Sequence, residues 1–315
     1  MKVLCAGLAV CDLIFRPMSL EVLQKDTSTA QDIKLSGGGD AYNVAMNLSS
    51  LGEKVELLTK IGNDDLGEYL FQKLEKAGIG VKWCKRVENP TSASGVFIKE
   101  DSERSFLSYK GACHSLCKED FTTTCLEGME YLYLGSAFDL PELDGREMAE
   151  VFEMAQRVGV KTILDTTGEP KAEDMKWFSE VLKHTDYFLP SLREAKLLTG
   201  CETPEEAARK FLTSGVGTVV IKLGEQGSLL VDREFEKRIN TFPTKAIDTT
   251  GAGDAFVAGF IKGLTEGLPT VKCAMYGNVL GSLAVEKLGA SGHEYEKEEI
   301  ERRLQYVARF TLSED

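Results

Sequence analysis

Residues Asp248–Phe256 read Asp-Thr-Thr-Gly-Ala-Gly-Asp-Ala-Phe, and this stretch carries the strongest structural signal in the chain. Gly251 and Gly253 permit left-handed backbone angles, which turn successive N–H groups toward one point, and a helix is expected to follow them. Converging N–H groups at a helix N-terminus form a binding site for an anion such as phosphate. The stretch therefore predicts an anion site at the start of a helix.

Asp254 directly follows the two glycines, in the first turn of the expected helix. The positive end of the helix dipole favours an ionised carboxylate, so the side chain is expected to be charged at neutral pH. A carboxylate beside a bound phosphate can accept a hydroxyl proton while a phosphoryl group moves to the oxygen. The pattern therefore predicts Asp254 as a catalytic base, with an anion hole formed by Gly251, Ala252 and Gly253.

Two other kinds of glycine-rich loop do not fit this stretch. A Walker A loop ends in Gly-Lys-Ser or Gly-Lys-Thr, whereas Asp254 follows Gly253 here. A dinucleotide-binding loop lies near the start of a βαβ unit and has a third glycine where this chain has Phe256. The alternative to a catalytic role is a turn that only caps a buried helix.

A second glycine-rich segment lies near the N-terminus, where Ser36–Ala45 leads from an expected strand end into a helix. Asp12 follows the first strand and should face the same crevice. Backbone amides and short acceptors at the carboxyl edge of a parallel sheet suit a polyhydroxylated ligand. Taken singly, each segment equally fits an ordinary turn or a solvated loop. The candidate ligand-binding residues are Asp12, Gly38, Gly39, Asp40 and Asn43.

Short runs of β-forming residues alternate with amphipathic helical stretches along the chain. This alternation predicts an α/β fold with a doubly wound, mostly parallel sheet and helices on both faces, in a single domain of residues 1–315. A strand pair around Gly227 and two helices, Asp254–Glu266 and Thr270–Lys287, are expected to end the chain. The expected strands are Val3–Leu8, Val55–Ile61, Tyr131–Leu134, Thr162–Asp165, Tyr187–Leu189 and Val219–Lys222.

Two segments interrupt the alternation, at about residues 15–35 and 85–111. Neither contains a good helix, and the second has two β-like runs, Ser94–Ile98 and Ser105–Tyr109, joined by a charged turn at residues 99–103. We expect these two segments to form a small β lid that projects from the main sheet.

The composition argues against several classes of partner. The net charge of -13 and the pI near 4.9 disfavour nucleic acid and membrane surfaces. No apolar run approaches the roughly 20 residues of a membrane span, and the N-terminal run is interrupted by Asp12, unlike a signal peptide. Cys113 and Cys117 flank His114 without the second pair of ligands that a zinc site needs. We therefore expect a cytoplasmic protein with reduced thiols.

The two glycine-rich segments together resemble the two signatures of the ribokinase-like (PfkB) family of carbohydrate kinases. These signatures are Gly38–Asn43 and Asp248–Phe256, and the similarity extends over essentially the whole chain. The resemblance implies an ATP-dependent kinase that transfers the γ-phosphoryl group to a hydroxyl of a small carbohydrate, with Mg²⁺ as a second cofactor. It implies the same base and anion hole, and it implies sugar binding by Asp12, Gly38, Gly39 and Asn43, with Asp40 at a position that differs among members.

The resemblance also extends to the nucleotide site. Ser191–Glu194 is similar to the family's Asn-x-x-Glu element near magnesium and the phosphates, with Ser191 in place of the asparagine. The same residues form an ordinary capping box, but we expect Glu194 to order magnesium-bound water. The other residues implied near ATP are Lys222, Gly224, Gly227 and Asn278.

Two further features follow from the resemblance. Family members often hold a monovalent cation such as K⁺ by backbone carbonyls, which implies Asp248, Thr250 and Gly289 here. The apolar residues of the lid hairpin also need cover, because an isolated hairpin is marginal in water. Since lids of the ribokinase group often pair, the resemblance implies a homodimer joined through the lids.

Two other functions stay open at this level. A nucleoside kinase would share both signatures and would need an apolar wall for the base, for which the candidates are Phe15, Phe97, Phe106 and Phe138. A catalytically inactive protein that binds a sugar or a nucleotide is the other alternative.

Overall fold

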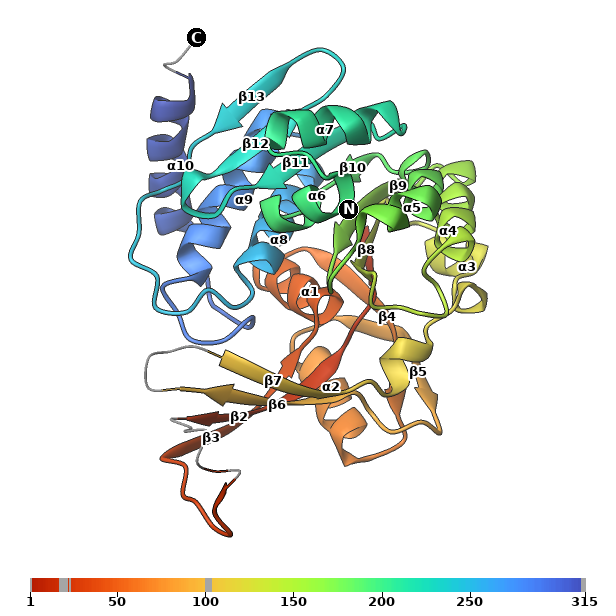
Figure 1. Cartoon of the computed structure of the whole chain (residues 1–315), viewed down its shortest axis with the longest axis vertical. Coiled ribbons are helices and arrows are strands. Elements are labelled where there is room, and N and C mark those ends of the chain that lie inside the picture. Colours follow the sequence, from red (N-terminus) through yellow and green to blue (C-terminus); the bar gives the residue numbers. More distant parts are fainter. Residues whose placement is uncertain (1, 17–21, 23, 100–103, 313–315) are drawn as a thin grey trace.

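The computed structural model describes residues 2–16, 22, 24–99 and 104–312, which form a large sheet and a small one (Figure 1). Within these residues the large sheet has the strand order β13-β12-β11-β10-β9-β8-β1-β4-β5. Its strands are parallel from β5 to β11, and β12 and β13 add an antiparallel edge. The bounds are β1 Lys2–Ala6, β4 Lys54–Gly62, β5 Gly80–Val87, β8 Tyr131–Ala137, β9 Lys161–Thr166, β10 Tyr187–Phe188, β11 Thr218–Lys222, β12 Ser228–Val231 and β13 Glu236–Ile239.

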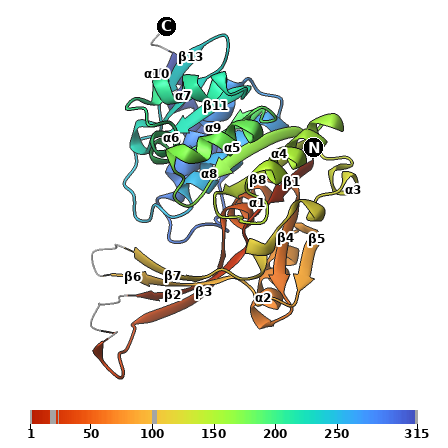
Figure 2. The ribbon, with the colours of Figure 1, turned by 45° about the vertical axis from the view of Figure 1, so that its right-hand side comes forward.

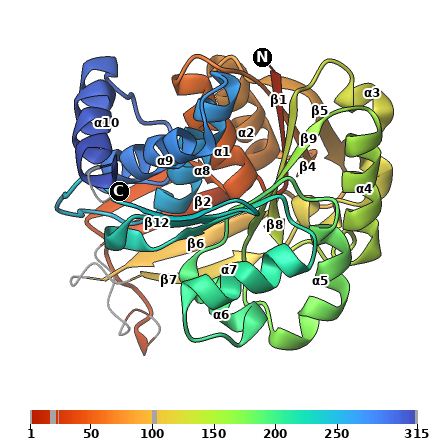
Figure 3. The same cartoon turned by 90° about the horizontal axis from the view of Figure 1, so that it is seen from above.

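Helices cover both faces of this sheet, so the doubly wound α/β architecture is confirmed (Figure 3). On one face lie α1 Asp40–Ser50, α2 Asp65–Lys76, α8 Ala252–Thr265, α9 Thr270–Ala284 and α10 Lys297–Leu312. On the other lie α3 Thr123–Leu126, α4 Arg146–Arg157, α5 Met175–Leu182, α6 Leu192–Thr199 and α7 Pro204–Thr213. All six expected strands are present.

The central strand β1 shows how the sequence builds two cores from one sheet. Successive side chains of a strand point to opposite faces, and a strand covered on both sides is therefore apolar at every position. Val3 and Cys5 pack in the core under α1 and α8, whereas Leu4 and Ala6 pack in the core under α4 and α5. All four side chains are fully buried, so the register of β1 is fixed from both faces.

The C-terminal part contains one helix more than the sequence analysis expected. The two expected helices correspond to α8 and α9, and α10 follows them and packs on α9. Ile300 and Val307 of α10 are buried at helical spacing. The expected count was wrong because this amphipathic pattern is diluted by the charged residues between 297 and 303.

The small sheet has the order β3-β2-β6-β7 and projects below the large one as a lid (Figures 1 and 2). Its strands are β2 Val10–Arg16, β3 Asp32–Gly38, β6 Ala93–Ile98 and β7 Arg104–Tyr109. The lid therefore begins earlier than expected from the sequence, at Val10, and residues 85–87 belong to β5 of the large sheet. Residues 17–21 and 23 of the expected lid, and 100–103 of its charged turn, lie outside the described residues.

The strand register shows which side chains of the lid face the site cavity and which face outward. Val96 pairs with Phe106, and both line the cavity between the lid and the large sheet. Phe15 pairs with Ile33 and with Phe97, which places these three on the opposite face. The outward face of the lid is therefore apolar, and Phe15 and Phe97 stack there with ring centroids 5.8 Å apart.

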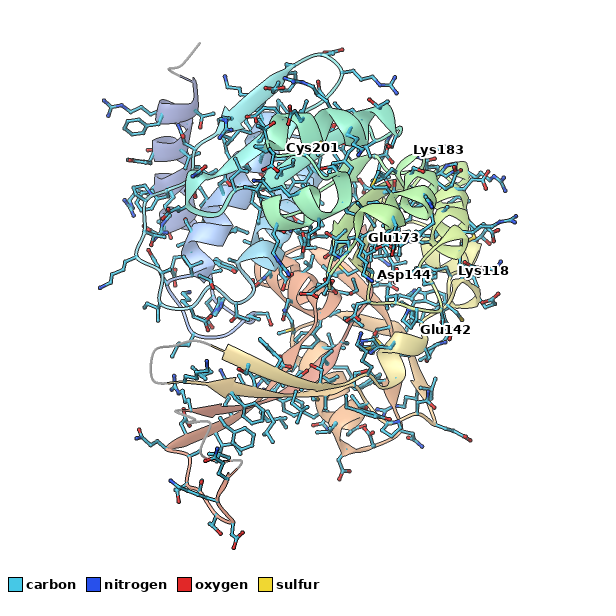
Figure 4. All side chains as sticks on the ribbon, in the orientation of Figure 1. Lys118, Glu142, Asp144, Glu173, Lys183 and Cys201 are labelled. Carbon is cyan, nitrogen blue, oxygen red and sulfur yellow. The ribbon has the colours of Figure 1, made fainter. Side chains whose placement is uncertain are left out.

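The side of the molecule around α4 and α5, at the right in Figure 4, carries charged side chains. Figure 4 shows Lys118, Glu173 and Lys183 on this side of the molecule, above the lid in this view. Lys118 pairs with Glu150 at 2.7 Å, an exposed contact of the kind that adds little to stability. Within the described residues, no helix is both long and apolar enough to cross a membrane.

Candidate active site

The two glycine-led helices meet at the carboxyl edge of the large sheet. Asn43 in the first turn of α1 donates a hydrogen bond from Nδ2 to Oδ2 of Asp254 in the first turn of α8, at 2.8 Å. These residues are 211 positions apart in the chain, so the fold brings together the two motifs that the sequence analysis singled out. Their N-termini point into a common site.

The anion hole predicted at Gly251 has the required backbone. Gly251 is the N-cap of α8 with φ +72°, in the left-handed region that side-chain-bearing residues rarely adopt. A Cβ on Gly251 would lie 2.2 Å from the carbonyl oxygen of Ala290, so the chain also passes too closely for any side chain. The backbone N–H of Ala252 donates to the Thr249 carbonyl oxygen at 3.3 Å, and the N–H groups that follow it in the first turn of α8 lack intrahelical acceptors and can bind an anion.

The electrostatic state of Asp254 differs from the sequence-based expectation. Burial, together with the nearby carboxylate of Asp40, raises the pKa of Asp254 to about 7, against the lowering effects of the Asn43 hydrogen bond and Lys222. The expectation of full ionisation considered only the helix N-terminus, whose effect is smaller than the cost of burying a charge. Asp254 is thus poised to gain or lose a proton near neutral pH.

Asp12 lies in the wall of a small cavity under the lid and is packed closely against Gly38. A Cβ on Gly38 would lie 2.1 Å from Oδ2 of Asp12, so the glycine leaves room for this carboxylate. Burial raises the pKa of Asp12 to about 6. The cavity has a volume of about 120 Å³, and its lining includes Asp12, Val96, Phe106, Thr250 and Ala290.

Asp40 is held by the protein itself. Its Oδ1 accepts hydrogen bonds from the Ser136 hydroxyl and the backbone N–H of Ala41, and its Oδ2 accepts one from Thr167 Oγ1 at 2.8 Å. Ser136 also accepts a hydrogen bond from the backbone N–H of Leu8. Asp40 therefore ties the start of α1 to the ends of β1, β8 and β9, a positioning contact that the sequence did not reveal.

Three buried polar atoms near Asp254 have no hydrogen-bond partner among the described residues. They are Asn43 Oδ1, Tyr133 OH and Thr166 Oγ1. Tyr133 is fully buried and lies close enough to Asp40, Asp165 and Asp254 for their charges to raise its pKa, after the larger effect of burial. Because buried polar groups normally have partners, these atoms indicate that polar groups of a ligand or water complete the site.

A larger cavity, of about 780 Å³, lies on the other side of the anion hole. Gly224 and Gly227 line it at the turn after β11, and both have positive φ angles of 62° and 82°. Asn278 lines it from α9, although its amide group also donates to the backbone oxygens of Ile239 and Asn240. The volume is in the range of small-molecule sites.

Ser191 and Glu194 form the capping box of α6. The backbone N–H of Ser191 donates to Oε2 of Glu194 at 2.7 Å, and the N–H of Glu194 donates to the Ser191 hydroxyl at 3.3 Å. Glu194 nevertheless lies near enough to Asp165, Lys222 and Asp254 to influence their pKa values. The two explanations offered for this segment are therefore compatible.

The segment before the anion hole is fixed by the Asp248 side chain. This buried carboxylate accepts hydrogen bonds from the backbone N–H of Thr250 at 2.7 Å and of Gly289 at 3.0 Å. It thereby brings the backbone of residues 248–250 next to the loop at Gly289, as the proposed cation site requires. The same loop supplies Ala290, which packs against Gly251.

The sequence analysis missed several residues that the fold brings to the site. Asp165, at the carboxyl end of β9, pairs with Lys222, and its position as the last residue of an expected buried strand is a signal that could have identified it. Nothing local marks the others. They are Ser136, Thr167, Tyr133, Phe242 and Ser282.

Known proteins resemble this chain over most of its length. The sequence profile described as the pfkB family of carbohydrate kinases matches residues 1–297. An ATP-dependent 6-phosphofructokinase of Thermoanaerobacterium thermosaccharolyticum is 28% identical over 263 residues, covering 80% of this chain and 80% of its own.

Solved structures resemble it as well. A crystal structure of ribokinase from Thermotoga maritima superposes with a TM-score of 0.82 at 28% identity, covering 96% of this chain and 99% of its own. A protein of E. coli that carries the name ribokinase II, in complex with ATP and Mg²⁺, has a TM-score of 0.81 at 22% identity, with coverages of 97% and 99%; this identity supports the fold alone.

The electrostatics of Asp254 predict an acid limb in the pH dependence of any reaction in which this carboxylate accepts a proton. Only the ionised form can accept it, so kcat/KM should rise with pH and level off above a midpoint of about 7. Well below pH 7 the rate should fall about tenfold per pH unit. The replacement Asn43→Ala removes a hydrogen bond to the ionised form and should move the midpoint to higher pH. A midpoint near the ordinary aspartate value of about 4 would contradict the assignment.

Proposed function

The chain belongs to the pfkB family of carbohydrate kinases and is an ATP-dependent sugar kinase, and from this premise we propose that Asp254 is its catalytic base for a monosaccharide held under the lid. The observation that carries the proposal is the place of Asp254. It stands at the start of α8, beside Ala252 and Gly253 in the wall of the larger cavity and near Thr250 in the wall of the smaller one.

The geometry supports a direct transfer. The terminal phosphoryl group of ATP would lie against the N–H groups of the anion hole, with the nucleotide in the larger cavity. The bond from the γ-phosphorus to its bridging oxygen breaks, a bond to the acceptor oxygen forms, and the hydroxyl proton passes to Asp254. Positioning and charge stabilisation supply most of the catalysis in such a transfer. Loss of the anion hole at Gly251 should therefore reduce the rate as much as loss of the base.

The cofactors are ATP and Mg²⁺, in keeping with the family. The carboxylate of Glu194, near those of Asp165 and Asp254, supplies oxygen donors of the kind that Mg²⁺ prefers. When bound, the ion neutralises charge on the phosphates. We propose that Glu194 holds a water of its coordination shell, with the oxygen that is not engaged by Ser191 N–H turned toward the site.

The lid cavity favours a sugar over a nucleoside as the acceptor. Of the four phenylalanines considered for a base-binding wall, Phe106 lines the cavity. Phe15 and Phe97 lie on the outward face of the lid, and Phe138 packs against Trp177 and Phe178 instead. A cavity of about 120 Å³ with Asp12 in its wall suits a small polyhydroxylated molecule.

An ADP-release screen tests this function. The panel should contain aldoses, ketoses, sugar acids, sugar phosphates and nucleosides, with Mg²⁺ and K⁺ present. Stimulation by at least one sugar and by no nucleoside is expected. Stimulation by nucleosides alone would favour a nucleoside kinase, whereas ATP binding without any acceptor-dependent turnover would favour the inactive binding protein.

Replacement of the base should separate catalysis from binding. Asp254→Asn removes the proton acceptor but keeps the shape of the helix start, so turnover should fall at least about 100-fold while the Kd for ATP changes by less than about threefold. Asp186→Asn is a matched control, because Asp186 lies at the opposite, amino edge of the sheet and accepts from Thr162 N–H there. A variant that kept most of its kcat would remove Asp254 from the mechanism.

We also propose a monovalent cation site formed by backbone carbonyls of Asp248, Thr250 and Gly289. The support is the Asp248 carboxylate, which clamps these two segments together beside the anion hole. A cation there would stiffen the loop that carries Ala290 and thereby the approach of that residue to Gly251.

Activity should therefore be higher in K⁺ than in Na⁺, because the larger, less strongly hydrated ion is more easily held by carbonyl oxygens alone. Initial rates in potassium-only and sodium-only buffers of equal ionic strength measure this. Asp248→Asn should reduce the difference between the two buffers. Equal rates in both buffers for the wild type would contradict the cation site and leave the kinase assignment unaffected.

The outward face of the lid supports the proposal of a homodimer. Ile33 and Leu107 are 60% and 71% exposed, and Leu13 and Tyr109 are exposed beside them. Contiguous apolar surface of this kind is unfavourable in water unless another surface covers it. We propose a second copy of the lid as the cover, because the face is largely apolar and would therefore match a second copy of itself.

The strand register identifies the residues that test this interface. Ile33→Lys with Leu107→Lys should yield monomers with a higher acceptor KM, because lid closure over the acceptor would lose its support. Val96 is unsuitable, since it faces the site cavity. Val158→Lys, at an exposed apolar position after α4, is the control and should leave the assembly unchanged. Light scattering that shows a wild-type monomer at micromolar concentration would defeat the proposal.

The cytoplasm remains our proposed compartment. All eight cysteines are free thiols, six of them buried, which fits a reducing environment.

A further inference from the structure

A buried ion pair links two strand ends beneath the anion hole. Lys222, the last residue of β11, donates from Nζ to Oδ2 of Asp165 at 2.7 Å. The two side chains are 14% and 5% exposed. The other oxygen of Asp165 accepts the backbone N–H of Thr166 at 2.9 Å, so the carboxylate is fixed at both ends.

The ammonium group of this pair faces the anion hole. Lys222 lines the larger cavity together with Ala252 and Gly253. Its Nζ lies 3.5 Å from the position that a Cβ on Gly253 would occupy. The ammonium group is therefore within contact distance of Gly253, one of the three residues of the anion hole.

The surroundings keep this group charged. Burial alone would lower the pKa of Lys222, but the attraction of neighbouring carboxylates outweighs burial and raises the pKa above its ordinary value. These carboxylates belong to Asp165, Glu194 and Asp254. Buried ion pairs often add little to stability because both charges lose their hydration. The location of this pair at a ligand site indicates instead that the ammonium group of Lys222 contacts a bound ligand.

We propose that Lys222 contacts the terminal phosphoryl group of ATP during transfer and that Asp165 is the positioning residue that holds its ammonium group over the anion hole. The inference rests on the proposed function. Negative charge spreads over the oxygens of the transferred group as the bond to ADP breaks and the bond to the acceptor forms. Lys222 stabilises that charge and keeps its own proton, while the hydroxyl proton goes to Asp254.

The main test compares affinities for nucleotides with and without the third phosphate. In Lys222→Met, calorimetry should show about a tenfold or greater loss of affinity for the β,γ-imido analogue of ATP and less than about a threefold loss for ADP, with kcat reduced about 100-fold. A lysine with only a structural role would affect both nucleotides alike. Equal losses, or no loss for either, would overturn the proposal.

Two further variants distinguish the phosphate contact of Lys222 from the positioning role of Asp165. Lys222→Arg keeps a cation of similar reach and should restore part of the preference for three phosphates. Asp165→Asn keeps the shape of the side chain but loosens the ammonium group, so the preference should fall while ADP affinity stays unchanged. Asp165→Asn also serves as the test if Lys222→Met does not fold. An Asp165→Asn protein with the wild-type ratio of ATP-analogue to ADP affinity would overturn the positioning role.

The pH profile gives a second, independent measurement. Lys222 lowers the pKa of Asp254, so Lys222→Met should shift the acid limb of kcat/KM to higher pH. This measurement tests whether the charge of Lys222 acts at Asp254, and an unshifted limb would count against a place for Lys222 at the reaction centre.

The chain provides a control for the loss of a buried lysine charge. Lys60 of β4 and Asp120 of the short helical turn Lys118–Asp120 are also 2.7 Å apart, with side chains 12% and 5% exposed. Lys60→Met leaves Asp120 paired with Lys85 at 2.7 Å, so it should lower Tm less than Lys222→Met, and it should preserve the ratio of affinities and the acid limb. The same change of ratio in Lys60→Met would overturn the proposal.

The outcome of the affinity measurements can be distinguished from the outcome of the acceptor screen. If no acceptor is phosphorylated but Lys222→Met selectively loses the ATP analogue, the nucleotide assignment of Lys222 holds and the proposed function fails. If a sugar is phosphorylated while the affinity ratio is unchanged in both variants, the function holds and this inference fails.

Discussion

The hydrogen bond between Asn43 and Asp254 is the contact on which the site depends. It joins the N-termini of α1 and α8, which belong to opposite ends of the chain, and it holds the candidate base at the anion hole. The contact forms only because both helices pack on the same face of the sheet, where they share a core. The position of Asp254 therefore depends on the packing of both helices on the same face of the parallel sheet.

The concentration of buried carboxylates is the second physical feature of the site. Asp40, Asp165 and Asp254 all lie at the carboxyl edge of the sheet, and each is tied by hydrogen bonds or by an ion pair. Burying several like charges is costly, and the cost appears as raised pKa values. The helix N-termini and Lys222 offset part of it. In the proposed function, the carboxylates would face Mg²⁺ and the ammonium group of Lys222 would face the phosphates of ATP.

The lid shows which features of the fold could be predicted from the sequence and which could not. The β pattern of Ser94–Ile98 and Ser105–Tyr109 predicted a hairpin, which the structure confirms as β6 and β7. The pattern did not reveal which face would meet the site, because Val96 and Phe97 are both apolar and alternate between faces. Only the pairing of β6 with β2 fixes that choice, since it aligns Phe97 with Phe15 on the outward face.

The sequence by itself determined the fold class and the motif residues, because strand and helix periodicity and the left-handed angles of glycine are local properties. It identified Asp254, Gly251 and Asn43 on this basis. The tertiary structure alone decided the partners of Asp165 and Asp40 and the protonation behaviour of Asp254. Those depend on burial and on charges brought close from distant parts of the chain, and neither quantity is encoded at any single position.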